Sequence, residues 1–398
     1  MSAARPGSRR VLVVSNDFPP DVGGIQSYAR DYLGTLDAAD VVVLASCRDA
    51  EACARFDAAL PYPVRRLSGY PLLPGPRTAR AMRHLIAQYG CTTVWFIAAA
   101  PLAALAPQAR AAGATRVVAS THGHEVGWGL VPGARQVLRR IFRGLDAVSV
   151  ISQFTAERLI PLLPSGLPLH FLPSGVDTAL YAPVPAERRL QARTALAAGG
   201  GPAVAADAPL VVCVSRLVAR KGQDTLIKAW PQVVERFPTA QLVIAGSGPA
   251  QRRLRRLRAS STAAASIWLM GAVSEEQKLE LLAAADLFAM PCRTRWAGID
   301  VEGLGIVYLE AQAAGLAVVA GDSGGAPETV PADAGVVVHA AGASAAEATA
   351  ASIIEILGEQ TLTLQQRAEV ARRSVTRKWT WAVMGGRLQK FLWLDAGA

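Results

Sequence analysis

The sequence predicts an α/β fold built from two doubly wound parallel-sheet domains. Short apolar runs, each bounded by glycine, proline or polar turns, recur along the chain, and segments with helical spacing separate most of them. This alternation is typical of parallel sheets covered by helices on both faces. The length of 398 residues also exceeds what one hydrophobic core normally serves, so we expect two domains.

The strands expected in the first domain begin with the apolar run 11–15, and the others are at 40–45, 93–97, 116–120, 147–151 and 170–172. A segment rich in proline, glycine and alanine, 177–209, is expected to link the domains, and the second sheet begins at 210–215. We place the two domains at residues 1–184 and 185–377. An amphipathic helix within 378–398 is expected to cross back to the first domain.

Composition limits the class of protein. An apolar content of 51% with 18% charged residues describes a globular chain, and no apolar run is long enough to span a bilayer. The run after the basic N-terminus is too short for a signal peptide. Five scattered cysteines, with no Cys-x-x-Cys pair, argue against a disulfide framework and a zinc site. We therefore expect a cytoplasmic protein.

The net charge of +10 is unevenly distributed. The residues up to Ala195 include 21 arginines, no lysine and 13 acidic residues, and so carry most of the excess. A basic first half favours an anionic partner, whether a phospholipid surface, a phosphorylated acceptor or nucleic acid. The arginine run 252–258 lacks interleaved aromatic residues, so we interpret it as a solvated helix face and expect no nucleic-acid partner.

The chemistry is expected to centre on the stretch 286–328, which opens with a buried strand and a proline. Glu302 and Glu310 lie eight positions apart across Gly303 and Gly305, and a helix is predicted over 306–314. The free N–H groups at its start and its dipole suit a diphosphate. One carboxylate can hold sugar hydroxyls and the other a ribose diol. The alternative is a pair of solvated surface charges.

Cationic and glycine residues follow other predicted strands, at the sheet edge where ligands bind in open α/β folds. Arg216 and Lys221 are placed to bind a diphosphate, or they form a solvated cluster. Gly23 and Gly24 open the first helix, where they contact a diphosphate or an acceptor, or simply form a tight turn. The strand and turn 268–271 offer backbone that can meet a purine base; Met270 and Gly271 are the expected contacts.

Two histidines, His122 and His124, follow a strand of the first domain. They resemble metal ligands in spacing, but no third ligand is close in sequence, so we expect no metal. We expect one imidazole to face the reacting sugar and the other to support the loop. The loop 246–251 has Gln251 where a dinucleotide motif needs its third glycine, so it does not predict a nicotinamide or flavin site.

Two basic amphipathic segments lie in the first domain. Arg77, Arg80 and Arg83 lie opposite an apolar stripe in 71–88, and a second such segment spans 135–143. Each is either a membrane-surface helix or a core-packed helix with a solvated face.

The motifs at 18–28, 121–128, 215–224 and 291–307 occur together and in order. They resemble the GDP-mannose-dependent phosphatidylinositol monomannoside mannosyltransferases, which are retaining family-4 glycosyltransferases of the GT-B fold. The resemblance covers nearly the whole chain. The Glu-x7-Glu and Arg/Lys motifs are general within GT-B enzymes, whereas the motifs Cys-Arg-Thr-Arg and His-Gly-His-Glu are narrower. Trp296, where a small residue is expected, and the glycine-rich link are departures.

The resemblance implies two Rossmann-like domains facing across a cleft. Arg216 and Lys221 would neutralise the diphosphate, Glu310 would bind ribose, and Glu302 would bind the transferred hexose. The backbone contacts to phosphate and sugar would come from Gly303, Leu304, Gly305, Ile306 and Val307. Gly23 and Gly24, together with Gln26, His122 and His124, would come from the acceptor side, with His124 among the catalytic residues.

The implied reaction is transfer of mannose from GDP-mannose to a phosphatidylinositol mannoside, on the inner face of the plasma membrane. Cations and helix-end N–H groups can stabilise the leaving diphosphate, and no Asp-x-Asp pair lies in a plausible metal-binding loop, so we expect a metal-independent reaction. Retention would follow front-face attack, since no carboxylate pair flanks the bond as in hydrolases. The alternatives are a UDP-sugar-dependent transferase of the same fold, acting on a polysaccharide or lipid-linked acceptor, and a nucleotide-sugar-binding protein without turnover.

Overall fold

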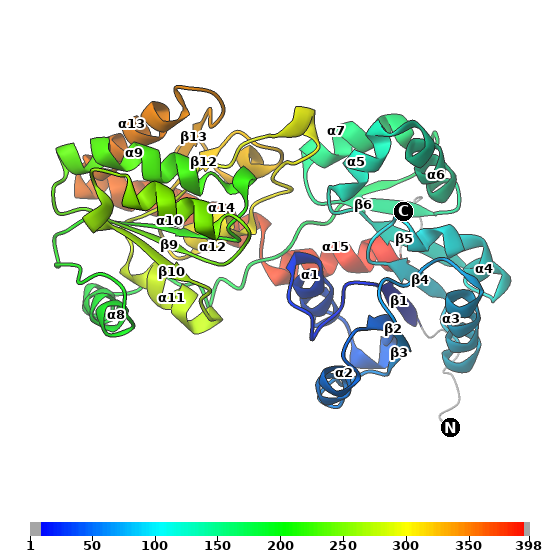
Figure 1. Cartoon of the computed structure of the whole chain (residues 1–398). Coiled ribbons are helices and arrows are strands. Elements are labelled where there is room, and N and C mark those ends of the chain that lie inside the picture. Colours follow the sequence, from blue (N-terminus) through cyan, green and yellow to red (C-terminus); the bar gives the residue numbers. More distant parts are fainter. Residues whose placement is uncertain (1–8, 394–398) are drawn as a thin grey trace. The chain divides into compact units, whose positions relative to one another are not determined.

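The computed structural model describes residues 9–393, which form two compact units (Figure 1). Unit 1 contains the chain up to Ser174 and the last helix, from Trp381, and unit 2 is Gly175–Thr380. The sequence placed these boundaries at 184 and 377. The chain enters unit 2 earlier because Tyr181 donates hydrogen bonds to Glu275 and Glu310 there. Residues 1–8 of the predicted first domain and residues 394–398 of the predicted C-terminal helical segment lie outside the described residues.

Unit 1 is built on a seven-stranded parallel sheet in the order β3-β2-β1-β4-β5-β6-β7. The central strands are buried on both faces, as expected where helices cover each side. The strands are β1 (Val11–Ser15), β2 (Val41–Cys47), β3 (Val64–Ser68), β4 (Thr93–Phe96), β5 (Arg116–Ser120), β6 (Ala147–Val150) and β7 (Leu169–Phe171).

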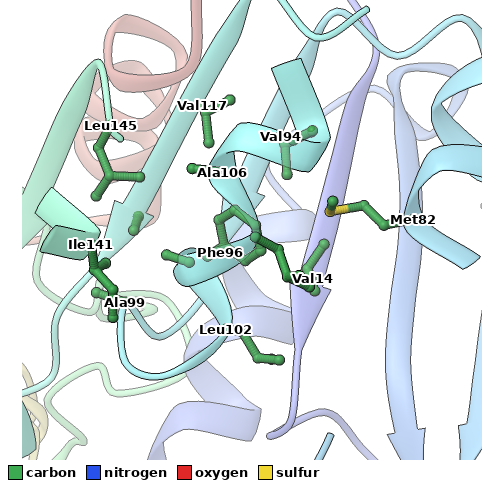
Figure 2. Close-up of a cluster of buried hydrophobic side chains, with 14 of the residues drawn as sticks. Val14, Met82, Val94, Phe96, Ala99, Leu102, Ala106, Val117, Ile141 and Leu145 are labelled. Carbon is green, nitrogen blue, oxygen red and sulfur yellow. The ribbon is translucent and has the colours of Figure 1, made fainter. Parts of the chain in front are cut away.

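The helices of unit 1 follow most of its strands and close its core. Figure 2 shows Phe96 of β4 among side chains such as Val14, Met82, Val117 and Ile141, from both strands and helices. The C-terminal helix α15 joins this unit and packs beside α1 (Figure 1). The helices are α1 (Gly24–Leu33), α2 (Ala50–Asp57), α3 (Pro76–Tyr89), α4 (Ala106–Ala111), α5 (His124–Leu130), α6 (Pro132–Phe142), α7 (Gln153–Leu159) and α15 (Trp381–Trp393).

Unit 2 repeats the design with a six-stranded parallel sheet in the order β10-β9-β8-β11-β12-β13. Its strands are β8 (Leu210–Val214), β9 (Gln241–Ala245), β10 (Ile267–Gly271), β11 (Leu287–Met290), β12 (Ala317–Gly321) and β13 (Gly335–Val338). Its helices are α8 (Ala186–Ala198), α9 (Gln223–Arg236), α10 (Gln251–Ala259), α11 (Glu275–Ala284), α12 (Ile306–Ala313), α13 (Ala345–Leu357) and α14 (Thr361–Lys378). Both units are thus Rossmann-like, which confirms the predicted fold class.

The predicted link 177–209 is not a plain connection, because α8 forms within it and packs on α11. Arg193 of α8 is almost fully buried, and its guanidinium lies 2.8 Å from the carboxylate of Asp286. It also donates to the backbone carbonyls of Ala206 and Ala208. These contacts compensate the burial of the charge and fix the segment to unit 2.

The two basic amphipathic segments differ in what their apolar residues contact. In α3, Met82, Leu85 and Ile86 are buried in the core, whereas its arginines are exposed. Leu130 and Val131, at the junction of α5 and α6, and Val137, within α6, are about half exposed. No helix within residues 9–393 combines the length and apolar character needed to cross a bilayer.

Candidate active site

A carboxylate and a lysine meet at the carboxyl edge of the unit 2 sheet. Lys221 follows β8 and Glu302 follows β11, and these strands are neighbours in the sheet. Lys221 Nζ lies 2.7 Å from Glu302 Oε2, and the two side chains are only 11% and 8% exposed. Because parallel strands end at the same edge, residues 81 positions apart form one buried ion pair.

Arginine and aspartate residues extend this pair into a cluster. Arg220 Nη1 lies 3.3 Å from Asp300 Oδ1, and Arg220 Nε lies 3.9 Å from Glu302 Oε2. Gly222 follows Arg220 and Lys221 in the loop after β8 and has φ +77°. A Cβ there would lie 1.9 Å from the carbonyl oxygen of Pro291. Only glycine therefore lets the loop after β8 approach the loop after β11 so closely.

The backbone of Glu302 is fixed by the loop after β12. Its N–H donates to Ser323 Oγ at 3.1 Å, and its carbonyl oxygen accepts from the N–H of Gly325 at 3.0 Å. Gly324 has φ +58°, and a Cβ there would lie 1.8 Å from that carbonyl oxygen. Gly324 and Gly325 thus hold the backbone of Glu302 in place.

Helix α12 begins at Ile306, as predicted, directly after the loop that carries Glu302. Gly305 precedes it at φ +83°, and a Cβ there would meet the ring of Tyr308 at 2.5 Å. The predicted backbone contacts, Gly303 to Val307, are therefore the turn into the helix and its first N–H groups. Such groups point away from the helix and are available to an anion.

Arg216 lies at the same sheet edge but is not part of the ion-pair cluster. Its backbone carbonyl accepts a hydrogen bond from Gln223 Nε2 at 2.9 Å, while its side chain is exposed. Among residues 9–393, its guanidinium contacts no hydrogen-bonding or ion-pair partner. It is therefore free to bind a solvent-side anion.

Glu310 belongs to a separate network. Lys278 Nζ lies 3.0 Å from Glu310 Oε1, and the hydroxyl of Tyr181 lies 3.3 Å from the same oxygen. Lys278 also pairs with Glu275 at 2.9 Å. Burial raises the pKa of Glu310, and the charge of Lys278 opposes that rise. Glu302 and Glu310 thus have different cationic partners, although the sequence treated them as one motif.

The predicted base contacts lie farther along the same sheet. Met270 and Gly271 end β10, and the carbonyl oxygen of Gly271 accepts from the N–H of Gly246 at 2.6 Å. A Cβ on Gly246 would lie 1.9 Å from the carbonyl oxygen of Ser215. The Gly-Ser-Gly loop after β9 is therefore explained by close packing against the loop after β8.

In unit 1, the start of α1 lies beside a carboxylate. Gly23 and Gly24 enter the helix, and Gln26 Nε2 donates to Asp17 Oδ1 at 3.1 Å. Burial raises the pKa of Asp17, and the nearby His124 lowers it. Sequence reasoning did not select Asp17, although its position after β1 was a usable signal.

The two histidines have different environments. His122 Nε2 lies 2.7 Å from the carbonyl oxygen of Ile97, and burial lowers its pKa to about 4, so it is neutral at pH 7. His124 is 42% exposed, and its Nε2 lies 3.2 Å from the fully buried Glu125. Glu125 also accepts from the N–H of His122 at 3.0 Å. Glu125 was not selected from the sequence. Within residues 9–393, no three His, Cys, Asp or Glu side chains are grouped to hold a metal ion.

Family models match both halves of the chain. Residues 22–180 match a model described as "Glycosyltransferase Family 4", and residues 202–374 match "Glycosyl transferases group 1". The two models together cover the sheet edges that carry the predicted residues.

Curated relatives match nearly the whole chain. A GDP-mannose-dependent monoacylated alpha-(1-6)-phosphatidylinositol monomannoside mannosyltransferase from Corynebacterium glutamicum is 46% identical over 97% of this chain and 98% of its own length. A GDP-mannose-dependent alpha-(1-6)-phosphatidylinositol monomannoside mannosyltransferase from Mycobacterium tuberculosis is 45% identical over 98% and 99%. The chain belongs to glycosyltransferase family 4.

Solved structures agree on the fold of this glycosyltransferase. Anabaena Alr3699/HepE in complex with UDP has a TM-score of 0.79 and 20% identity, over 96% of this chain and 99% of that one. Sucrose-phosphate synthase from Thermosynechococcus elongatus has a TM-score of 0.76 and 23% identity, over 96% and 98%. Two parallel-sheet Rossmann-like domains of the GT-B type are therefore established for this enzyme.

Proposed function

We propose that this glycosyltransferase moves mannose from GDP-mannose to a phosphatidylinositol mannoside or a similar lipid, with retention of configuration and without a metal. The buried Lys221–Glu302 pair at the carboxyl edge of unit 2 carries the proposal. It combines a cation for a leaving diphosphate with a carboxylate for a sugar. The identity of 45–46% to the two mannosyltransferases supports the choice of donor and acceptor.

Departure of GDP is the step in which negative charge develops. Lys221 and the exposed Arg216 would neutralise the diphosphate, and the first N–H groups of α12 would bind its oxygens. Positioned cations and N–H groups of this kind stabilise a transition state because they need no reorganisation as the charge grows. Glu302 would accept hydrogen bonds from hexose hydroxyls. The acceptor hydroxyl would attack the anomeric carbon from the face that the diphosphate leaves, and its proton would pass to the departing diphosphate oxygen.

The nucleoside is assigned to the neighbouring edge of unit 2. Glu310 would accept hydrogen bonds from the ribose diol, and the backbone of Met270 and Gly271 would contact the guanine. Burial raises the pKa of Glu310, and Lys278 opposes that rise and so favours the carboxylate, the form that accepts two hydroxyl protons.

The acceptor side is assigned to unit 1. Gln26 and His124 would contact acceptor hydroxyls, and His122 would hold the loop, because its ring already bonds to the carbonyl oxygen of Ile97. Gly23 and Gly24 would let a ligand approach the start of α1, where a side chain would otherwise stand. His124, half exposed and beside Glu125, is the member of this group that is suited to touch substrate.

Membrane association is proposed to be purely electrostatic at α3, and to combine electrostatic and apolar contacts at α6. Arg77, Arg80 and Arg83 are exposed on α3, but its apolar stripe is buried and cannot insert. On α6, Arg135 and Arg140 are exposed, as are Leu130 and Val131 at the junction with α5. Each basic residue near an anionic bilayer contributes about 1 kcal/mol to binding.

Sedimentation with anionic vesicles tests this part of the proposal. Charge reversal of either arginine set is expected to lower the bound fraction at low salt. At high salt the charges are screened, so any remaining binding should depend on the apolar residues near α6 and should change little on charge reversal. Unchanged sedimentation of both variants would reject membrane binding by these surfaces.

The transfer itself is tested with labelled GDP-mannose and phosphatidylinositol monomannoside, in the presence of a chelator. We expect a mannosylated lipid with an α-linkage; mild alkali should remove its acyl esters and leave the labelled mannose on the headgroup. If UDP-sugars support the reaction instead, the donor assignment is wrong. If the protein binds a sugar nucleotide but transfers nothing to any lipid or glycan acceptor, it is a binding protein.

A further inference from the structure

A small hairpin lies two residues before Glu302. Arg295 and Asp300 close it through backbone hydrogen bonds of 2.9 and 3.3 Å, and their side chains pair at 3.1 Å. Residues 296–299 form its tip, which includes the 3₁₀ turn η6 (Trp296–Gly298). The hairpin is therefore held at its base by two kinds of interaction.

The tip is strained and exposes apolar side chains. Trp296 and Ala297 both have φ of 50°, a left-handed conformation that side chains disfavour. The side chain of Trp296 is 66% exposed and that of Ile299 is 56% exposed. Single exposed apolar residues are common, but two consecutive residues in a disfavoured conformation cost free energy, and an indole left mostly in solvent offsets little of it. Such strain is typical of functional sites.

The base of the hairpin is joined to the proposed hexose site. Asp300 pairs on one side with Arg295 and on the other with Arg220, whose Nε lies 3.9 Å from Glu302 Oε2. The cluster also contains Lys221. It therefore has three cations and two carboxylates, and carries a net positive charge. The position of the tip is thus tied to the groups that would hold donor hexose and diphosphate.

The chemistry of the tip fits a sugar or cyclitol ring that carries an anion. The C–H face of such a ring packs on the negative face of an indole, and a phosphate beside it would complement the positive base. The guanidinium carbon of Arg295 lies 4.6 Å from the ring centroid of Trp296, so cation and aromatic face are presented together.

We propose that Trp296 and Arg295 form a docking platform for the glycosylated inositol-phosphate headgroup of the acceptor. The inference rests on the proposed function, since it takes its ligand class from it. The platform selects acceptors by the ring and phosphate next to the reacting sugar, rather than by the acyl chains. Trp296 is thus a specificity-determining residue and does not take part in the bond-breaking step.

The test is equilibrium binding of a water-soluble probe, deacylated glycerophosphoinositol monomannoside, in the presence of GDP. The proteins compared are wild type, Trp296→Ala, Trp296→Phe and Leu362→Ala. Leu362, 69% exposed on α14, is a matched control for loss of an exposed apolar side chain. Thermal midpoints are expected to change little, because both side chains are mostly exposed.

Trp296→Ala is expected to weaken probe binding by about tenfold, as loss of one aromatic stacking contact implies. Trp296→Phe should retain most of the affinity, and Leu362→Ala all of it. Calorimetry should give the same GDP-mannose affinity for all four proteins.

Equal probe affinity in wild type and Trp296→Ala would overturn the inference and leave the proposed function intact. The inference would also be overturned if Trp296→Ala lost vesicle binding while its probe affinity stayed unchanged, because the tip would then insert into lipid. If wild type binds GDP-mannose but not the probe, the acceptor class is wrong and the inference falls with it.

Discussion

Replacement of Lys221 by methionine tests whether its ion pair with Glu302 serves stability or catalysis. The pair is 2.7 Å long and about nine-tenths buried, so the variant leaves a carboxylate without its close cation. Breaking a buried pair on one side costs about 3–5 kcal/mol of unfolding free energy. Arg220 remains at 3.9 Å and compensates in part, so we expect about 3 kcal/mol.

The same substitution should weaken donor binding for a separate reason. Loss of a charge-assisted hydrogen bond to a diphosphate costs about 1.5–3 kcal/mol, or about 10- to 150-fold in Kd. The double variant Lys221→Met with Glu302→Gln removes both charges. Its unfolding free energy should return to within about 1 kcal/mol of wild type, because no uncompensated charge stays buried. Donor affinity and transfer should not return.

Chemical denaturation measures the first effect, and calorimetry with GDP-mannose and initial rates of transfer measure the second. Comparison of the single and double variants separates a structural role of the pair from a catalytic one. If the pair is only structural, unfolding free energy and transfer should be lost and recovered together. The reasoning is refuted if the double variant recovers transfer along with stability, or if Lys221→Met binds GDP-mannose as wild type does.

Three further predictions concern the groups around the site. Lys278→Met removes the cation that lowers the pKa of Glu310, so this pKa should rise further. The pH below which GDP affinity is lost should therefore be higher than in wild type, as calorimetry at several acidic pH values would measure. Gly324→Ala places a Cβ 1.8 Å from the carbonyl oxygen of Glu302, so GDP binding and the thermal midpoint should both fall. Glu125 is expected to orient His124, whose Nε2 lies 3.2 Å away, so Glu125→Gln should lower transfer about tenfold or more while GDP affinity in unit 2 stays the same. Rates equal to wild type would reject this orienting role.

The raised pKa of Glu310 also has a consequence for stability. The folded state holds more protons than the unfolded state between the ordinary pKa of a glutamate and the raised value. This group's contribution to the unfolding free energy therefore falls as pH rises through that interval. Glu310→Gln should flatten the pH dependence of stability there, as measured by denaturation at several pH values.

Much of the fold could be predicted because buried parallel strands have a strong signal. The apolar runs at 93–97, 116–120 and 147–151 coincide with β4, β5 and β6 to within a residue. Strand β3 was missed because it is an edge strand in which Arg65 and Arg66 stand among the apolar residues. Arg66 pairs with Asp57 at 2.7 Å, a contact between residues that no periodicity reveals.

The site was less accessible to the sequence, for a topological reason. Lys221 and Glu302 could each be assigned to a strand end, but their contact depends on β8 and β11 being neighbours in the sheet. The local sequence pattern does not determine the order of strands in a sheet. Tyr181 and Lys278 come from a connecting segment and an ordinary helix surface, and nothing in a single sequence marks them as partners of Glu310. The two basic segments had the same apolar pattern, and only their packing shows that one stripe is buried.

The most direct test of the central claim is a calorimetric titration of the purified enzyme with GDP-mannose and with UDP-glucose, in parallel and without divalent metal. We predict saturable binding of GDP-mannose, lost in Lys221→Met, and little or no binding of UDP-glucose. Selective binding of UDP-glucose would contradict the assigned donor, and with it most of the case for the inositol-lipid acceptor. Binding of GDP-mannose only after addition of a divalent cation would contradict the metal-independent diphosphate site.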